Sequence, residues 1–544
     1  MNFFGNYKAF LHILITLVIL FSGACIKEDF SFRKLDTSLD IEPALATPLG
    51  FFSLRLDENF QLNSAAEFSV NSDRIICLNY FKKIVTEPAG EIFRFDPILY
   101  EVSIPNPTGG VIDLSSGSYE MNYSARIPLF LSNTGINAEI DSVTLSSGII
   151  SIREAQVPGV IMETRIIIPG LKLNGNSFHL ELLPENEGIN YGLSGYTLEL
   201  NSEEQRNNLI DIEVYISYPS QNHILPVLEP LIHFNFDLSI REWYKITGYL
   251  GQEIINIGQN SIITDLNSLF TGGEFYFADP NLILTTSNSF SVPIGLGLSH
   301  LNAESSAGIV LISGTGIPVP PDYFHPAYPQ PGNSLLEISD SVKIDSKNTN
   351  LAEIISYKPY TINYNLELLM NPGNEKTENT IYSKSRFAAD FRLELPFHGS
   401  ARTIPFQDTL HFDLSRLNFP MDQDIRNVIF RLYYENSFPA EIEIQLYLAD
   451  ENLMIIDTLL ETPTKIEAAE PVDRSSENPA FVSGQLETSI PGNELQNVRN
   501  GRFMILEGVL NTNESYDIVK IFDNQGLKAN LSVIFDIKSN IEDF

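Results

Sequence analysis

Cysteine, tryptophan, histidine and positive charge are all scarce in this chain of 544 residues. It has two cysteines, one tryptophan and eight histidines, and its 34 Lys and Arg residues stand against 69 Asp and Glu, for a formal net charge of −35. Two cysteines cannot build a disulfide framework, so the apolar core has to stabilise the fold. The excess of negative charge excludes ordinary nucleic-acid binding, which depends on neutralising phosphates with Lys and Arg.

Recognisable catalytic and metal-binding motifs are missing as well. The histidines show no pair at metal-ligand spacing, and His398 is expected in a turn. Ser194 lies in Gly-Leu-Ser-Gly-Tyr, which lacks the final glycine of a nucleophile elbow. The carboxylates are so numerous that no two of them stand out as a glycosidase pair. The sequence therefore predicts no metal site, no cofactor and no catalytic residue, and it favours a protein without chemistry of its own.

Two of the scarce side chains are expected in the core. Cys77 lies in the apolar run Arg-Ile-Ile-Cys-Leu, which predicts a buried and inert thiol rather than a nucleophile. Trp243 follows Arg241 and Glu242, and we expect it to be a core anchor rather than a platform for a sugar.

The first residues of the chain have the layout of a secretory signal peptide. Lys8 precedes an apolar run over residues 9–21, and the small residues Ser22–Ala24 follow it. The run is shorter than the ~20 residues of a membrane-spanning helix, and no later run is longer. We interpret residues 1–24 as a removed signal and Cys25 as a lipid-bearing first mature residue. The segment resembles the signals of bacterial lipoproteins, and an ordinary signal that happens to precede a cysteine is the alternative.

The residues behind Cys25 carry a second targeting pattern. Lys27, Glu28 and Asp29 follow the cysteine closely. This order resembles the Lys-then-acidic export signal of Bacteroidota surface lipoproteins. The resemblance implies a protein that is lipid-anchored in the outer membrane and faces the extracellular side. The alternative is a solvated, charged tether, which a chain leaving a bilayer tends to have.

Alternating hydrophobicity dominates the rest of the chain. Within residues 210–218 every even position is apolar and most odd positions are polar, which predicts a strand with one face on a core. Similar runs at 391–395, 442–448 and 531–537 are separated by turn signals such as the Asn-Pro-Thr-Gly-Gly of 106–110. We predict a mainly β protein, built of several antiparallel β-sandwich or barrel-like modules with a few short helices.

Domain boundaries are weakly marked. Helical segments are expected at 265–270 and 494–499, each stopped by glycine and followed by a strand. Six prolines mark a long loop at 314–332, and the polar stretch 465–479 is the best candidate for a linker. The predicted division is a signal peptide at 1–24, a lipidated tether at 25–47, an N-terminal β domain at 48–230, a central β module with a short helix and the Pro-rich loop at 231–335, a β domain at 336–470, and a C-terminal α/β segment at 471–544.

The Pro-rich loop is the best candidate for a binding surface. It carries Tyr323, Phe324, His325 and Tyr328 between prolines that restrict the backbone. Aromatic faces held in this way could stack on sugar rings or on a partner protein at a low cost in ordering. In the alternative, the aromatic side chains fold back and close the end of a sandwich.

The mature chain as a whole resembles the large β-rich surface lipoproteins of Bacteroidota. The resemblance lies in residues 43–50, 141–148 and 434–439 and brings no catalytic residues with it. It implies a binding or structural role at the outer-membrane surface, with the membrane as one partner through Cys25 and a glycan or surface protein as another. A fainter likeness of residues 275–293 to tubular or late-embryogenesis-type lipid-binding modules leaves a lipid-binding protein as an alternative. A glycan-active enzyme is the other alternative.

Overall fold

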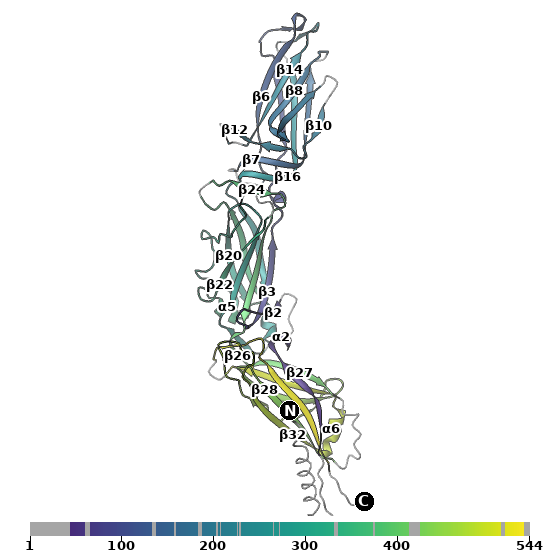
Figure 1. Cartoon of the computed structure of the whole chain (residues 1–544), viewed down its shortest axis with the longest axis vertical. Helices are drawn as coiled ribbons and strands as arrows, with labels where there is room; N and C mark the ends of the chain where they lie inside the picture. Colours follow the sequence, from purple (N-terminus) through teal and green to yellow (C-terminus); the bar gives the residue numbers. More distant parts are fainter. Residues whose placement is uncertain are drawn as a thin grey trace, which may run out of the picture.

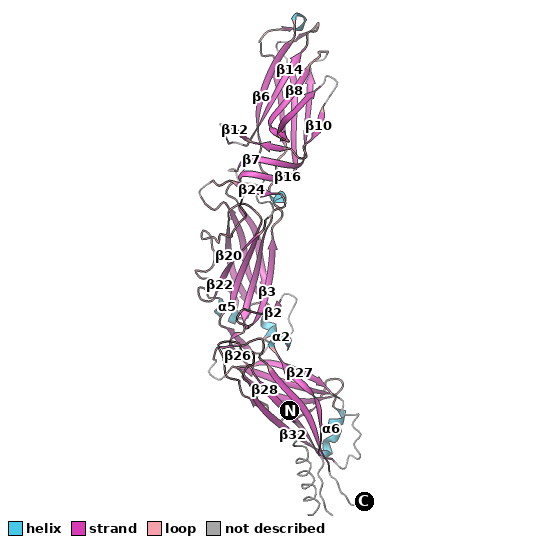
Figure 2. Cartoon of the chain, viewed as in Figure 1, coloured by secondary structure: helices cyan, strands magenta, loops and turns pink. Residues whose placement is uncertain are grey.

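The computed structural model describes residues 44–537, apart from 60–65, 133–137, 157–158, 183–187, 203–204, 207, 226, 228–229, 265, 271, 331–335, 374–375, 413–424 and 513–516. Strands make up most of the described chain, and its helices are short (Figure 2). Three β-rich bodies lie end to end and give the molecule an elongated shape (Figure 1). We name these bodies the lower, middle and upper modules, after their places in the figure.

The lower module consists of two antiparallel sheets with two short helical segments, η4 (Gly492–Glu494) and α6 (Leu495–Asn500). The first sheet has the order β1 (Ala44–Leu54), β35 (Leu527–Ile537), β28 (Ile425–Asn436), β32 (Val482–Pro491). The second has the order β27 (Ile404–His411), β33 (Phe503–Asn511), β29 (Glu441–Ala449), β30 (Ile455–Thr458), with β31 (Thr464–Ile466) against β29. The sheets pack closely where Gly50 of β1 leaves room for the side chain of Leu410 of β27.

The middle module is also a pair of antiparallel sheets. One has the order β2 (Ala66–Val70), β3 (Ile76–Val85), β25 (Phe387–Pro396), β19 (Asn281–Asn288), β22 (Ile338–Asp345). The other has the order β17 (Ile254–Ile263), β23 (Thr361–Met370), β20 (Ile294–Ser305), β21 (Gly308–Leu311). The rings of Tyr364 on β23 and Phe391 on β25 stack with centres 4.1 Å apart, which joins the two sheets through the core.

The upper module is formed by a ten-stranded sheet that nearly closes on itself. Its strands are β24 (Asn379–Tyr382), β16 (Pro230–Tyr249), β7 (Glu139–Gln156), β11 (Thr197–Glu199), β8 (Glu163–Leu173), β14 (Leu209–Tyr218) and β6 (Tyr119–Pro128), with β4 (Ile98–Pro105) on β16, β9 (Asn176–Leu182) on β8 and β10 (Ile189–Gly192) on β7. The hydroxyls of Tyr100 on β4 and Tyr123 on β6 lie 3.0 Å apart and bridge the two edges of this sheet. That hydrogen bond, together with burial, raises the pKa of Tyr123 to about 12.

Smaller elements complete the described chain. Two short strand pairs, β5 with β15 and β12 with β13, cover parts of the upper module; they are β5 (Ile112–Asp113), β12 (Asn201–Ser202), β13 (Gln205–Arg206) and β15 (Ile224–Leu225). The remaining helical segments are α2 (Leu56–Asn59), α3 (Ala89–Ile92), η2 (Leu114–Ser116), α4 (Leu266–Leu269) and α5 (Leu351–Ser356). None of the helices in the described ranges is long and apolar enough to cross a membrane.

A small sheet and an aromatic cluster connect the middle module to the lower one. The sheet has the order β18 (Glu274–Phe277), β26 (His398–Arg402), β34 (Val519–Lys520). Beside it, four phenylalanine rings pack with centres 4.5 to 6.1 Å apart; they are Phe270, Phe275, Phe277 and Phe397. An ion pair of 3.0 Å between Arg74 and Asp523 also crosses this junction. The middle and lower modules are therefore joined by apolar contacts and an ion pair as well as by the covalent chain.

The chain visits the three modules in a nested order, and both ends of the described part lie in the lower module (Figure 1). It climbs from β1 through β2 and β3 into the upper module and returns through β17–β25, of which β24 still pairs with β16 of the upper module. It finishes in β26–β35. The sheet pairing therefore groups residues differently from the predicted division, because β16, which begins at Pro230, pairs with β4 and β7, and β3 pairs with β25. The division stays a prediction, since pairing does not show which segments fold independently.

The predicted fold class is confirmed, because antiparallel strands and a few short helices build all three modules. The alternation at 210–218 becomes β14, whose even residues are buried. Cys77 and Trp243 are buried as predicted, with 0% and 3% of their surface exposed. The turn predicted at His398 is wrong: this residue begins β26 and pairs with Lys520 of β34, a segment distant in sequence.

Candidate binding site

The predicted anchor and export residues lie outside the described part of the chain. These are Cys25, Lys27, Glu28 and Asp29. Their roles stay predictions.

The Pro-rich loop lies against β20, in the four-stranded sheet of the middle module. Phe324 and Leu296 of β20 exchange two main-chain hydrogen bonds, of 2.7 and 2.9 Å. The side chain of Tyr323 covers Gly295 and Gly297, since a Cβ added at either glycine would lie 3.0 Å from it. Its hydroxyl donates a 3.4 Å hydrogen bond to Glu367, and burial together with that carboxylate raises the pKa of Tyr323.

The four aromatic residues of this loop therefore do not form one exposed row. Tyr323, Phe324 and Tyr328 are half-buried, and His325 is exposed. Tyr323 and Phe324 fold back along strand β20, whereas the alternative expected the aromatic side chains at the end of a sandwich. A binding role for the loop stays a prediction.

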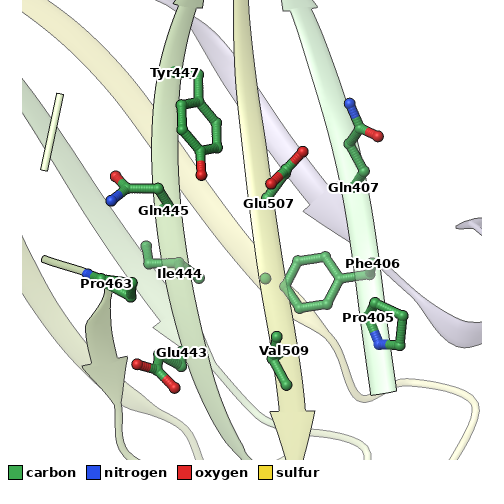
Figure 3. A pocket seen from close by; sticks show the side chains of 11 residues that line it. Pro405, Phe406, Gln407, Glu443, Ile444, Gln445, Tyr447, Pro463, Glu507 and Val509 are labelled. Carbon is green, nitrogen blue, oxygen red and sulfur yellow. The ribbon is translucent and has the colours of Figure 1, made fainter. Parts of the chain in front are cut away.

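A groove of about 590 Å³ crosses the second sheet of the lower module (Figure 3). Glu443 and Tyr447 line it from β29, and Glu507 and Gln407 from β33 and β27. The buried amide of Gln445 already bonds the main chain of Leu460 in both directions. The groove presents exposed carboxylates, which repel an anionic ligand and leave neutral or cationic molecules as the ones it could take.

A second groove, of about 330 Å³, lies on the outer face of the upper module. Cross-strand pairing places Tyr215 of β14 next to Arg165 of β8, and the guanidinium lies 4.8 Å from the centre of the tyrosine ring. The hydroxyl of Tyr215 donates to Glu213, which raises the pKa of Tyr215. The one aromatic face of this groove is thus already covered by the protein's own cation.

The third groove, which we name the elbow groove, lies where the upper module meets the middle module. Its volume is about 560 Å³, and it is lined by Arg94, Phe95, Ile240, Arg241, Trp243 and Lys384, among others. These residues come from the segment after α3, from β16 and from the turn after β24. Ser146 of β7 also lines it, so four stretches that are distant in sequence build one site.

Irregular strand pairing shapes the elbow groove. The register between β16 and β7 shifts repeatedly between Ile240 and Lys245, which bends β16 and turns its side chains out of strict alternation. Trp243 fixes the bend, because its indole Nε1 donates a 2.7 Å hydrogen bond to the carbonyl of Phe93. On the other wall, the Gly90 N–H donates to the carbonyl of Ser383 at 2.8 Å. The walls are therefore held by hydrogen bonds before any ligand binds.

The charges in the elbow groove differ from those of the rest of the chain. Arg241 and Lys384 are exposed and make no hydrogen bond or ion pair within the described residues. Arg94 pairs with Glu91, and Glu242 is the other carboxylate of the lining. In a chain with net charge −35, this leaves a local excess of positive charge above a floor that includes buried Phe95, Ile240 and Trp243.

The elbow groove was not predicted from the sequence. Arg94 and Lys384 are far apart in the chain, and no local pattern marks either of them. The only signal was the triplet of Arg241, Glu242 and Trp243, whose tryptophan was correctly expected in the core. Among the described residues, no group of three or more His, Cys, Asp and Glu side chains is placed to hold a metal ion.

Comparison with known proteins gives no family for this chain. No family model matches it, and no curated protein matches it. Among solved structures, it is similar to a candidate secreted protein from Parabacteroides distasonis, at 15% identity over 54% of this chain and 89% of that one, with a TM-score of 0.29. It is also similar to a structure of infectious bursal disease virus, Gt strain, at 9% identity over 84% and 83% of the two chains, with a TM-score of 0.14. Neither likeness supports an inference about this chain.

Proposed function

We propose that this protein is a lipid-anchored cell-surface protein that binds a carboxylate-bearing ligand in the elbow groove. The observation that carries the proposal is that Arg241 and Lys384 line one groove and make no hydrogen bond or ion pair with the described residues. A carboxylate placed between them would gain charge-assisted hydrogen bonds. Binding would need little rearrangement, because Trp243 already holds the bend that forms the groove.

An acidic sugar is the ligand class that fits this groove best. A uronic acid has a carboxylate for the two cations and an apolar ring face for the floor that includes Phe95 and Ile240. Ser146 and Ser383 add hydroxyls that suit sugar hydroxyl groups. A groove of about 560 Å³ has the volume of an ordinary small-molecule site. The proposal thus makes the predicted glycan partner an acidic one.

The fold gives the proposed anchor a consistent geometry. Ala44, the first described residue, pairs with Asp536, whereas Leu54 at the other end of β1 pairs with Leu527 next to the middle-module junction. The chain therefore leaves the lower module at the end away from the other modules. A lipid on Cys25 would tether that end and present the elbow groove and the upper module to the medium.

Calorimetric titration of the purified chain with a tetramer of galacturonic acid tests the binding half of the proposal. We expect saturable binding that weakens as salt rises from about 0.05 M to about 0.5 M, because screening shortens the reach of the exposed cations. The double variant Arg241→Gln/Lys384→Gln should bind about tenfold more weakly or worse, a loss of about 1.4 kcal/mol. A neutral glucose tetramer should not bind.

The matched control removes the same charge elsewhere. Lys343 and Lys347 are exposed in the middle module and form no ion pair within the described residues, so Lys343→Gln/Lys347→Gln should bind as the wild type does. If both double variants bound equally weakly, the loss of affinity would reflect the change in net charge and not a site in the elbow groove. Binding of a tetraglutamate peptide but not of the uronic-acid tetramer would contradict the sugar class.

Metabolic labelling with an alkyne fatty acid tests the anchor separately. Wild-type protein should take up the label, Cys25→Ala should not, and protease added to intact cells should digest the wild type. Unlabelled wild type would remove the anchor but leave the elbow groove untouched. If the protein is labelled but resists protease, its body lies on the periplasmic side of the outer membrane.

The other functions considered from the sequence gain no support from the grooves. Sheltering an acyl chain needs an apolar groove. The three grooves described above all carry charged side chains in their walls. Within the described ranges, no geometry singles out a pair of carboxylates for glycan cleavage.

A further inference from the structure

The turn that joins β29 to β30 exposes three consecutive apolar side chains. Leu453 is 53% exposed, Met454 68% and Ile455 55%. Single exposed apolar residues are normal on a protein surface, but a contiguous group at the tip of a hairpin is a feature of contact sites. We name these three residues the apolar tip.

The backbone of this turn is fixed in a way that holds the tip outward. The carboxylate of Asp450 accepts hydrogen bonds from the N–H groups of Asn452 and Met454, at 2.8 and 2.9 Å. The Asp450 N–H donates to the Met454 carbonyl at 3.0 Å and closes the turn. Leu453 has φ +62°, in the left-handed region that Gly, Asn and Asp occupy more readily. A leucine in this conformation, with half its surface in water, breaks a local rule and gains no packing in return, which is typical of functional positions.

The apolar tip lies at the end of the lower module from which the N-terminal segment leaves. Along β29, Ala449 next to the tip pairs with Phe503, whereas Glu441 at the other end pairs with Asn511 near the middle module. Phe503 also pairs with His411, the last residue of β27, and β1 packs on β27 where Gly50, in the second half of β1, faces Leu410. Because β1 begins at Ala44 beyond that contact, the tip and the exit of the tether share one end of the molecule.

We propose that the apolar tip inserts into the outer leaflet of the membrane that holds the lipid of Cys25, and so sets the orientation of the molecule. This inference rests on the anchor of the proposed function. The occupant is a lipid surface because the end that bears the tip is the end that the tether keeps near the bilayer. Burial of three apolar side chains would add to the anchor, as apolar residues do in interfacial proteins. Asp450 and Glu451 flank the tip, so insertion should favour zwitterionic over anionic lipid.

Fluorescence of a label at the tip tests this inference on the full lipidated chain. In Met454→Cys, a polarity-sensitive dye attaches to the new thiol, because Cys77 is fully buried and Cys25 carries lipid. The protein is reconstituted on phosphatidylcholine vesicles. We expect a blue shift of the dye emission and quenching by spin labels carried on the lipid chains. The control is Leu311→Cys, which carries the dye at a residue of similar exposure (61%) in the middle module and should show neither effect.

The outcomes separate the tip from the anchor. Protein that floats with the vesicles while the dye at residue 454 remains as exposed to water as the dye at 311 would overturn the inference and leave the anchor intact. Protein that does not float at all would overturn the anchor and the inference with it. A blue shift at 454 that appears without vesicles and grows with protein concentration would assign the tip to a second copy of the chain instead. Thermal melting of both variants checks that each remains folded.

Discussion

The indole Nε1 of Trp243 donates a 2.7 Å hydrogen bond to the main-chain carbonyl of Phe93. Phe93 follows α3, whereas Trp243 lies in the bent part of β16, so this bond ties together two segments separated by 150 positions. Both residues are almost fully buried. The single tryptophan of the chain thus ties the wall of the elbow groove that carries Arg241 to the segment after α3.

Replacing this tryptophan should lower the stability of the fold around the elbow groove. Trp243→Phe keeps an aromatic ring but leaves the buried Phe93 carbonyl without its donor, which should lower the free energy of unfolding by about 1–3 kcal/mol. Urea denaturation followed by circular dichroism measures the change. Tyr244→Phe is the control, because Tyr244 is 48% exposed and should change stability little. Equal stability of Trp243→Phe and the wild type would show that the bend does not need this bond.

A buried tyrosine hydroxyl predicts a stabilising substitution. Tyr364 is fully buried in the middle module, and its hydroxyl is among the buried polar atoms without a partner. Tyr364→Phe keeps the stacking on Phe391 and removes the unsatisfied group, so it should raise the free energy of unfolding by about 1 kcal/mol. The exposed Tyr433→Phe should have no effect. A Tyr364→Phe variant less stable than the wild type would reveal a partner for this hydroxyl.

The same residue predicts a change of stability with pH. Burial raises the pKa of Tyr364 above its ordinary value of 10.0. Above pH 10 the tyrosine of the unfolded chain ionises while the folded one stays protonated, so the unfolded state gains stability and the free energy of unfolding falls. Between pH 10 and 12 the wild type should therefore lose more stability than Tyr364→Phe. Parallel pH profiles for the two proteins would contradict a raised pKa at this residue.

One glycine of the lower module should tolerate no side chain. A Cβ at Gly508 of β33 would lie only 1.9 Å from Cζ of the Phe406 ring on the neighbouring strand β27. Gly508→Ala should destabilise the lower module by about 1–3 kcal/mol, as overpacked sites do. Gly192→Ala is the matched control, since no atom lies within 4 Å of the Cβ it would add. The measurement is the melting temperature of each variant. If Gly508→Ala melts at the wild-type temperature, the side chain of Phe406 can change its rotamer without loss of stability.

The thiol of Cys77 should be unreactive in the folded protein. It is fully buried, and burial together with nearby Glu394 raises its pKa to about 12. Since the thiolate is the reactive form, a chromogenic disulfide reagent at pH 8 should label this residue only after denaturation. Prompt labelling of the native protein would show that β3 opens.

The sequence predicts those parts of the fold that depend on short-range patterns. Alternation at 210–218 predicted β14, and the apolar surroundings of Cys77 predicted its burial. The nested path through the modules was not predictable, because the pairing of β3 with β25 joins residues some 300 positions apart and leaves no local trace. The elbow groove was not predictable for a similar reason, since Arg241 in the irregular part of β16 and Lys384 in a distant turn line one groove only in the folded chain. The Pro-rich loop was located correctly, but the packing of Tyr323 depends on Gly295 and Gly297, which no local pattern connects with it.

The most direct test of an acidic-ligand site in the elbow groove uses Trp243 as a probe, because this residue is the only tryptophan of the chain and lines the groove. The intrinsic fluorescence of the purified chain is followed during titration with a galacturonic acid tetramer, in the wild type and in Arg241→Gln/Lys384→Gln. A carboxylate bound beside these cations should give a saturable change of tryptophan emission in the wild type, weakened by salt and lost or shifted about tenfold in the double variant. Emission that does not respond, or that responds equally in both proteins, would contradict an acidic-ligand site at the elbow.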